Sequence, residues 1–507
     1  MSGMRYLINK YSTSSTINFR LIFKELGRLL MVESAFMTVP LIVSLFCEES
    51  DWSAFAITFA ISFATGLALY FLSCPKNRVL KRRGGMLLAS LAWIMISLFG
   101  MLPFILCSTP LNVSEAFFEA ISGFTTTGAT VIRDVESCSK GILLWRALTQ
   151  WIGGLGIVLF TLSFISAMNN NGSLMLFRAE STGITHEKLS ARLSLTAKTL
   201  WGLYALFTIV LILLLWCGSM TFFDSVCHAF SCISTGGYST HNESIAAFQS
   251  PYIKIVLMMF MFIGGTSFGL IIVGVKTSVR EIWRNDVFRA YLLAVLVYYA
   301  LMVFAIVYRD HYTGWESVTI DPLFHIVSAM TSTGFSAGNW EEWGILVLTL
   351  TFFMMYVGAC AGSTTGGAKF DRLLYLIKNF RSVVRKYVRP RLVMSVDVNG
   401  QYINSERSNE ISAFIFIYTL LIIFGGVVLV VHGFPIVDAF FSSVSCLSNN
   451  GLGAGVTGVT GSYDFLPASG MWVMSVLMLA GRLEIFTLIA ILSPSFWKNS
   501  IFINQKI

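Results

Sequence analysis

Long apolar stretches alternate with short polar ones along almost the whole chain of 507 residues. Each stretch is about 20 residues long, which is the length that an α-helix needs to cross the hydrocarbon core of a bilayer. We therefore predict ten membrane-spanning helices, near residues 29–47, 54–73, 86–106, 142–167, 200–218, 251–275, 290–308, 344–368, 411–431 and 468–492. The residues before the first span are polar and basic, so we expect that span to be an uncleaved signal-anchor.

The charged residues follow the same division. Hydrophobic residues make up 55% of the chain and charged residues only 12%, against about 25% in a soluble domain. Most of the 35 Lys and Arg residues fall in polar segments that would then face the cytoplasm, which places both termini on the inside. The outer segments hold few basic residues and many carboxylates, so the outer mouth is predicted to be negative and to concentrate cations.

One pattern of residue types occurs four times. An acidic residue is followed seven positions later by serine and thirteen positions later by glycine, with a hydroxyl residue at the tenth position. The four copies are Glu115/Ser122/Thr125/Gly128, Asp224/Ser231/Ser234/Gly237, Asp321/Ser328/Thr331/Gly334 and Asp438/Ser445/Ser448/Gly451. A turn between helices would explain one such segment, but it does not explain four segments in one register.

Each copy lies between two predicted spans and is expected to form a short re-entrant helix followed by an extended loop. The acid suits the N-cap of the helix, and the glycine suits a position of positive φ. Carbonyl oxygens of such loops can replace the water shell of a cation. We predict that the filter is formed by Thr126, Thr127, Gly128, Thr235, Gly236, Gly237, Ser332, Thr333, Gly334, Asn449, Asn450 and Gly451.

The predicted fold is an all-α polytopic membrane protein. Four helix–pore loop–helix repeats take a pseudo-fourfold arrangement around one pore, with two extra helices at the N-terminus. The expected divisions are 1–74 for the N-terminal extension and 75–168, 169–275, 276–392 and 393–507 for the four repeats. Within the last cytoplasmic connection, Asn399-Gly400 lies in an alternating segment and is typical of a two-residue hairpin turn.

A glycine-rich interruption falls inside the predicted span of the third repeat, at 358–368. Glycines spaced four apart are typical of a helix-packing face, which is one interpretation. Hydroxyl residues and paired glycines disfavour a continuous helix, so the other interpretation is a broken helix that gates the pore. The predicted gating residues are Gly362, Ser363, Thr364, Thr365, Gly366, Gly367 and Lys369, and the charge of the last would help to hold the loop shut.

Arg482 lies inside the last apolar span, where a cation is costly unless it faces water or a partner. One interpretation is a structural ion pair. The favoured interpretation places Arg482 in the pore below the filter, as a positive barrier that slows cation flow. Glu484 is two positions away and would point off another face of a continuous helix, so we expect that it does not neutralise Arg482.

Other function classes fit the sequence less well. An enzyme would need a cluster of acids, bases or metal ligands, and the nine cysteines have no metal-ligand spacing. A carrier of organic solutes would need inverted repeats, whereas these four share one orientation. We therefore predict that the chain is not an enzyme and that it conducts cations.

Several motifs resemble the TrkH/TrkG-type subunits of the Trk/Ktr/HKT superfamily of potassium transporters. They are LWRALTQWIGGLG (144–156), FIGGTSFG (262–269), GACAGSTTGGAK (358–369) and LAGRLEIFTL (479–488), and the third reads GSTTGG where the family pattern has GSTGGG. The resemblance implies a potassium cargo with no organic cofactor, a homodimer, and a cytoplasmic NAD- or ATP-binding regulatory subunit of the TrkA type. It also implies the cytoplasmic membrane of a bacterium and no nucleic-acid partner. A sodium-permeable or cation-coupled symporter of the same fold is the alternative.

Overall fold

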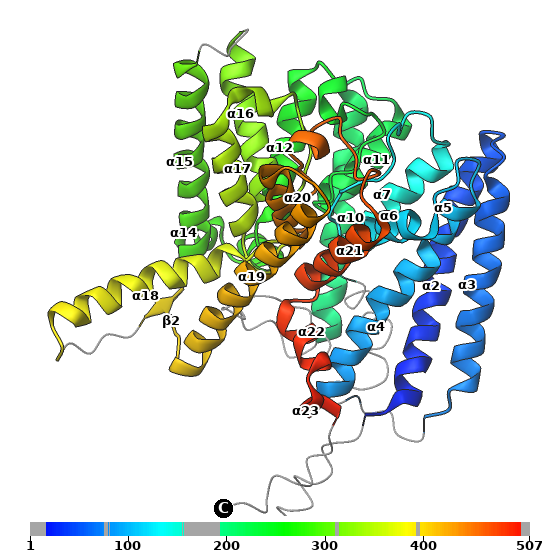
Figure 1. The fold of residues 1–507 in the computed structure, drawn as a ribbon, viewed down its shortest axis with the longest axis horizontal. Coiled ribbons are helices and arrows are strands. Elements are labelled where there is room, and N and C mark those ends of the chain that lie inside the picture. The colour runs from blue at the N-terminus through cyan, green and yellow to red at the C-terminus, as the bar shows by residue number, and fades with distance from the viewer. Residues whose placement is uncertain are drawn as a thin grey trace, which may run out of the picture.

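The computed structural model describes residues 17–75, 80, 82–154, 156, 193–309, 314–391 and 396–497, and these are almost entirely helical (Figure 1). Among these described residues, six helices are long and apolar enough to cross a membrane, and two further pairs of helices qualify as bent spans. Parts of the predicted span 142–167 and of the polar segment after it lie outside the described residues. The chain therefore has the polytopic all-α architecture that the apolar pattern predicts.

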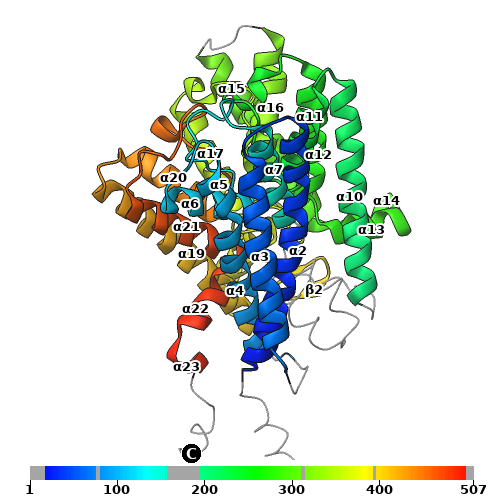
Figure 2. The same ribbon diagram turned by 90° about the vertical axis from the view of Figure 1, so that its right-hand side faces the viewer.

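The N-terminal extension is a pair of long helices, α2 (Phe19–Phe46) and α3 (Trp52–Leu72), that lie side by side at one edge of the molecule (Figure 2). They approach closely at two glycines, because a Cβ atom at Gly27 would lie 2.6 Å from the carbonyl oxygen of Gly66. Helix α2 begins well before the predicted residue 29. Asn18 caps it by accepting a hydrogen bond from the backbone N–H of Leu21 at 3.2 Å.

In each of the four predicted repeats a long helix precedes a short helix and another helix follows it. These flanking helices are called outward and inward, after the direction that the sequence predicts for them. The outward helices are α4 (Arg82–Gly100) with its continuation α5 (Leu102–Leu106), α10 (Leu193–Cys217), α15 (Asp286–Tyr308) and α19 (Ser405–Val431). The short helices are α6 (Val113–Phe124), α11 (Phe222–Ile233), α16 (Trp315–Met330) and α20 (Ile436–Ser448). The inward helices begin with α7 (Lys140–Gly154), α12 (Pro251–Gly265), α17 (Ile345–Val357) and α21 (Ala468–Arg482).

Three of the inward spans are broken, and in two of them the sequence predicts a continuous helix. Helix α12 meets α13 (Phe268–Lys276) at a bend of 95°, and α21 meets α22 (Ile485–Leu492) at a bend of 112°. Helix α17 ends at Val357, and the chain resumes as α18 (Phe370–Val388) only after a loop. The predicted spans 251–275 and 468–492 are therefore wrong as single helices, because hydropathy averaged over about 20 residues does not register a bend at Thr266–Ser267 or at Leu483–Glu484. The break after Val357 agrees with the broken-helix interpretation of 358–368.

The remaining elements are short. They are α14 (Val279–Arg284), α23 (Pro494–Trp497) and the 3-10 turns η1 (Ser244–Ala247), η2 (Trp340–Trp343) and η3 (Gly455–Thr457). The predicted hairpin is confirmed, since β1 (Asp397–Val398) pairs antiparallel with β2 (Gln401–Tyr402). Asn399 and Gly400 have φ values of 53° and 71°, as a type I′ turn requires. Figure 1 shows α18 and this hairpin extending to one side of the helix bundle.

Candidate functional site

The four short helices end in the same hydrogen-bonded turn. Each ends in a residue with a left-handed backbone, with φ of 56° at Thr126, 55° at Thr235, 49° at Ser332 and 52° at Asn449, which follows the C-cap in the first three helices and is the C-cap of α20. The next N–H donates to the carbonyl oxygen of the repeated serine, from Thr127 to Ser122 (2.8 Å), Gly236 to Ser231 (2.8 Å), Thr333 to Ser328 (2.9 Å) and Asn450 to Ser445 (3.0 Å). This is a Schellman motif. The repeated serine of the sequence pattern is its acceptor, and the four segments share one geometry.

The four loops that follow, 125–128, 234–237, 331–334 and 448–451, are called the central loops below. Their glycines all have positive φ, 84° at Gly128, 78° at Gly237, 83° at Gly334 and 83° at Gly451, as predicted. A Cβ atom on each glycine would collide with a carbonyl oxygen of the next repeat. The distances would be 2.1 Å from Gly128 to Gly236, 1.9 Å from Gly237 to Thr333, 2.1 Å from Gly334 to Asn450 and 2.3 Å from Gly451 to Thr127. The central loops therefore touch in cyclic order, and the fourth loop closes onto the first.

The acidic residues are not the N-caps that the sequence predicts. Glu115, Asp224 and Asp438 lie at the third position of their helices, after the caps Asn112, Thr221 and Pro435. At this position an acid still faces the positive end of the helix dipole, and Glu115 completes a capping box with Asn112. Asp321 differs because α16 begins earlier, and it forms an ion pair with Lys254 at 2.7 Å.

Asn449 and Asn450, the amides of the fourth loop, bind neighbouring segments. The Nδ2 atom of Asn449 donates to the hydroxyl of Thr127 at 2.9 Å and to the carbonyl oxygen of Met478 at 2.9 Å. Asn450 Nδ2 donates to the carbonyl oxygen of Ala329 in the third repeat at 2.7 Å. The two amides that replace hydroxyl residues in this loop are thus hydrogen-bond donors, and they hold the loop to the first and third repeats.

A buried ion pair lies behind the first two central loops, and no pattern in the sequence predicts it. Arg146 Nε donates to Glu119 Oε1 at 2.8 Å, and both side chains are almost fully buried. Glu119 also accepts from the hydroxyl of Thr130 and from the backbone N–H of Val131. One turn further along α7, Gln150 Nε2 donates to the carbonyl oxygen of Gly236 at 2.7 Å. Helix α7 therefore holds the backbone of the second central loop through Gln150, and through Arg146 and Glu119 it holds the segment that follows the first.

The loop at 358–369 lies against the inner side of the central loops. The N–H of Gly366 donates to the hydroxyl of Ser332 at 2.6 Å, and a Cβ atom on Gly366 would lie 1.9 Å from the carbonyl oxygen of Ser448. Thr364 Oγ1 accepts from the hydroxyl of Thr235 at 3.3 Å. The predicted gating residues are thus brought to the second, third and fourth repeats at once. The left-handed φ of Gly358 (70°), Gly362 (77°) and Gly367 (81°) excludes one continuous helix here, and with it the packing-face interpretation.

The same loop is anchored at its far end. Lys369 is buried and donates from Nζ to the carbonyl oxygen of Thr365, which fits the predicted role of its charge in holding the loop. Within the loop, the hydroxyl groups of Ser363 and Thr365 are hydrogen-bonded to each other, with Oγ and Oγ1 2.7 Å apart. At the start of α18, Arg372 Nη2 pairs with Glu484 Oε1 at 2.6 Å. The loop is therefore tied to the fourth repeat by a charge pair.

Arg482, at the C-terminal end of α21, donates to backbone carbonyls of two other repeats. Its Nη1 reaches the oxygen of Thr364 at 2.9 Å, and its Nη2 reaches Gly154 at 3.0 Å and also Gly153. The sequence placed Glu484 on another face of one continuous helix. In the structure the helix bends between them, so Glu484 is separated from Arg482 by that bend rather than by helical phase. Arg482 thus joins the third-repeat loop to the end of α7.

Comparison with known proteins gives one consistent result. A sequence model of the TrkH family, described as cation transport protein, matches residues 52–499. The chain is 32% identical over 488 residues to the Trk system potassium uptake protein TrkH of Salmonella typhimurium, covering 95% of this chain and 100% of that protein. It is 31% identical over 490 residues to TrkG of Escherichia coli, covering 96% and 100%. The crystal structure of the potassium transporter TrkH from Vibrio parahaemolyticus superposes with a TM-score of 0.86 at 30% identity, covering 95% of this chain and 100% of that one.

Proposed function

The chain belongs to the TrkH family of cation transport proteins, and we propose that it carries potassium into the cell between its four central loops. It is a multi-pass membrane transport protein and not an enzyme. The observation that carries the proposal is a closed ring of contacts between the loops. Each loop glycine (Gly128, Gly237, Gly334 and Gly451) lies against a carbonyl oxygen of the next repeat, namely that of the residue just before the glycine there. Such packing holds four loops around one axis, where their carbonyl oxygens can replace the hydration shell of a cation.

The filter of this proposal consists of the residues from Thr126, Thr235, Ser332 and Asn449 to the glycine of each loop. These are the residues whose backbone runs from the left-handed turn to the positive-φ glycine in every repeat. Gln150 and Arg146 donate to the carbonyl oxygens of Gly236 and Ser239, in and just after the second central loop, and so support that loop from behind. Since the support differs from repeat to repeat, the filter has approximate rather than true fourfold symmetry.

The loop at 358–369 acts as the gate in this proposal, with Arg482 as a positive barrier beside it. The hydrogen bonds of Gly366 and Thr364 to residues of the central loops support a closed position directly on the cytoplasmic side of the filter. Opening would require these bonds, the contact from Arg482 to Thr364 and the neighbouring Arg372–Glu484 pair to rearrange together. A regulator that moves α18 would also move the loop, because α18 follows it directly in the chain.

The proposed setting is the cytoplasmic membrane of a bacterium, with both termini inside. The proposed partners are a second copy of the chain and a cytoplasmic nucleotide-binding subunit of the TrkA type. The similarity to proteins of the Trk potassium uptake system supports a regulatory partner in general. Uptake coupled to a second cation is the alternative that a flux measurement would separate from a gated channel.

Growth of a bacterium that lacks its own potassium uptake systems tests this function. Expression of the chain should restore growth at low external potassium, with its regulatory subunit supplied. Growth restored only by added potassium, despite normal amounts of protein in the membrane, would contradict the proposal.

A further inference from the structure

Helix α2 carries a glutamate whose carboxyl group is enclosed by the protein. Glu33 lies midway along the helix and is 4% exposed. Among the residues that the structure describes, no hydrogen-bond donor reaches either of its carboxylate oxygens. Glu119, which is equally buried, instead receives donors from Arg146, Thr130 and the backbone of Val131. The two glutamates are therefore in opposite electrostatic situations.

The carboxyl group of Glu33 lies against α4 beside the end of the first short helix. A Cβ atom on Gly100 would lie 3.1 Å from Glu33 Oε1 and 2.5 Å from the ring of Phe124. Trp145 covers the same point, since its Nε1 donates to the carbonyl oxygen of Gly100 at 3.0 Å. Phe124 is the last residue of α6 and directly precedes the first central loop. The site thus has an apolar and aromatic lining and adjoins the filter region.

Within the part of the chain that the structure describes, the elements that pack against α2 bring no charge to compensate Glu33. Helix α3 has no charged residue, and Arg83 of α4 is 17 residues from Gly100, about 25 Å along a helix. On α7, Arg146 is paired with Glu119, and Lys140 lies at the outer end of the helix. Each of these groups is therefore paired elsewhere or far along its helix.

The remaining charges are those of α6 and of α2 itself. Glu115 of α6 is used in its capping box, at the end of the helix away from Phe124. On α2, Glu25 pairs with Arg28 at 3.0 Å, and the other basic residues of the helix lie toward the cytoplasm. An isolated carboxylate in such surroundings costs several kcal/mol relative to water.

We propose that Glu33 is a proton-binding site inside the membrane, occupied in this conformation. The carboxylate takes up one proton to become a neutral carboxylic acid, and among the described residues no group of three or more His, Cys, Asp or Glu side chains could hold a metal ion there. A proton is thus the ligand that removes the charge without needing further room. Release of the proton would leave a bare anion against Phe124, so the deprotonated form needs α2, Gly100 or Phe124 to move.

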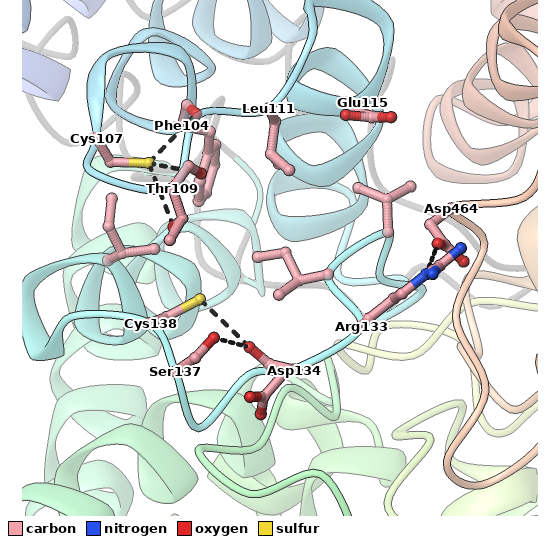
Figure 3. Close-up of a pocket in the computed structure, with 13 residues that line it drawn as sticks. Phe104, Cys107, Thr109, Leu111, Glu115, Arg133, Asp134, Ser137, Cys138 and Asp464 are labelled. Carbon is pink, nitrogen blue, oxygen red and sulfur yellow. Dashed lines mark hydrogen bonds and ion pairs between the residues drawn. The ribbon is translucent and has the colours of Figure 1, made fainter.

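A route for the proton lies on the outer side. A cavity of about 290 Å³ lies between α5, α6 and α7, and Phe104 and Ile142 line it. Charged side chains also line this cavity (Figure 3). It has room for several waters. Phe104 is one turn beyond Gly100, and Ile142 is one turn before Trp145. The part of the cavity that Phe104 and Ile142 line is thus about one helical turn from the groups that enclose Glu33.

The coupling to transport rests on the proposed function. Because Phe124 contacts the enclosure of Glu33 and precedes Thr125, a movement that admits the charged carboxylate also displaces the first central loop. Uptake should therefore fall as the outer pH rises far enough to remove the proton. Glu33→Gln, which keeps the neutral shape, should show a flat profile over the same range.

Infrared spectroscopy of the purified full-length protein tests the site without any transport. The wild type should show the carbonyl stretch of a protonated carboxylic acid at neutral pH, and Glu33→Gln should lose that band. Glu25→Gln, at the cytoplasmic end of the same helix, is the matched control and should keep it. Glu33→Asp, which keeps an acid there, should shift the band and covers the case that Glu33→Gln folds poorly.

A wild-type-minus-Glu33→Gln spectrum without a carboxylic-acid band would overturn the proton site. The same pH profile of uptake in wild type and Glu33→Gln would overturn its coupling to the filter. If the band is present but the protein moves no potassium, the site stands and the proposed function fails, so the two failures are distinguishable.

Discussion

Gly451 lies directly against the carbonyl oxygen of Thr127, which joins the last central loop to the first across more than three hundred residues of sequence. A Cβ atom at Gly451 would lie only 2.3 Å from that oxygen. The same relation holds between each of the other three glycines and the next repeat. The closed ring of contacts leaves no space for a side chain at these four positions. Glycine is therefore required there for lack of space, in addition to the positive φ that the sequence predicts.

The ring predicts that a serine at Gly128, Gly237, Gly334 or Gly451 weakens the preference for potassium over sodium. The side chain would clash with a backbone carbonyl and would also strain a residue at positive φ, at a cost of about 1–3 kcal/mol for the strain alone. Competitive uptake of potassium and sodium measures this. Gly338→Ser is the control, because a Cβ atom there meets nothing within 4 Å. Wild-type selectivity in all four variants would contradict the ring.

Arg482→Ala should raise the cation flux. A unit charge about 6 Å from a passing cation opposes it by about 3 kcal/mol at an effective dielectric of about 20. That is a barrier of about a hundredfold in rate. Arg482→Lys keeps the charge and should retain most of the barrier, and neither change should alter the potassium-to-sodium ratio. A flux that falls in proportion to the amount of folded Arg482→Ala protein would instead assign the residue a structural role.

The loop at 358–369 should restrain flux in the absence of the regulatory subunit. Thr364→Val removes the hydroxyl that binds Thr235 and the carbonyl oxygen of Gly264 with little change of shape, so the closed loop is weakened. Basal flux should rise, and deletion of 362–367 should raise it further and reduce dependence on the partner. Thr349→Val, at an exposed position of α17, is the control. Unchanged basal flux in both loop variants, with normal folding, would remove the loop from gating.

The buried pair of Glu119 and Arg146 should matter for stability. Glu119→Gln leaves the guanidinium buried without its carboxylate and should lower the free energy of unfolding by about 3–5 kcal/mol. Replacing both residues together, as Glu119→Gln with Arg146→Met, should cost less than the sum of the single changes. Thermal unfolding of the purified protein in detergent measures this. Additive losses would show that the two side chains act independently.

Much of this architecture could be predicted from the sequence because four copies of one pattern constrain each other. The acid, serine and glycine recur in one register, so their structural roles could be assigned as a set, although three of the four acids proved to be third helix residues and none a cap. The hairpin at Asn399-Gly400 followed from local turn chemistry alone. Features that depend on a short local pattern were therefore accessible.

Contacts between distant segments were not. Glu119 and Arg146 lie on different helices and have no sequence periodicity to connect them. The break at Leu483–Glu484 lies in a stretch that is apolar on average, so hydropathy runs through it, and the partner of Glu484 is Arg372 in another repeat. The isolation of Glu33 depends on which helices enclose α2, and no pattern along one chain encodes that.

The most direct test of potassium selection by the central loops is ion flux through the purified protein in liposomes at a fixed membrane potential. Potassium and rubidium should pass and sodium should pass far more slowly in the wild type, whereas Gly334→Ser should lose this difference and Gly338→Ser should keep it. Equal passage of sodium and potassium through the wild type, or unaltered selection in Gly334→Ser, would contradict the account.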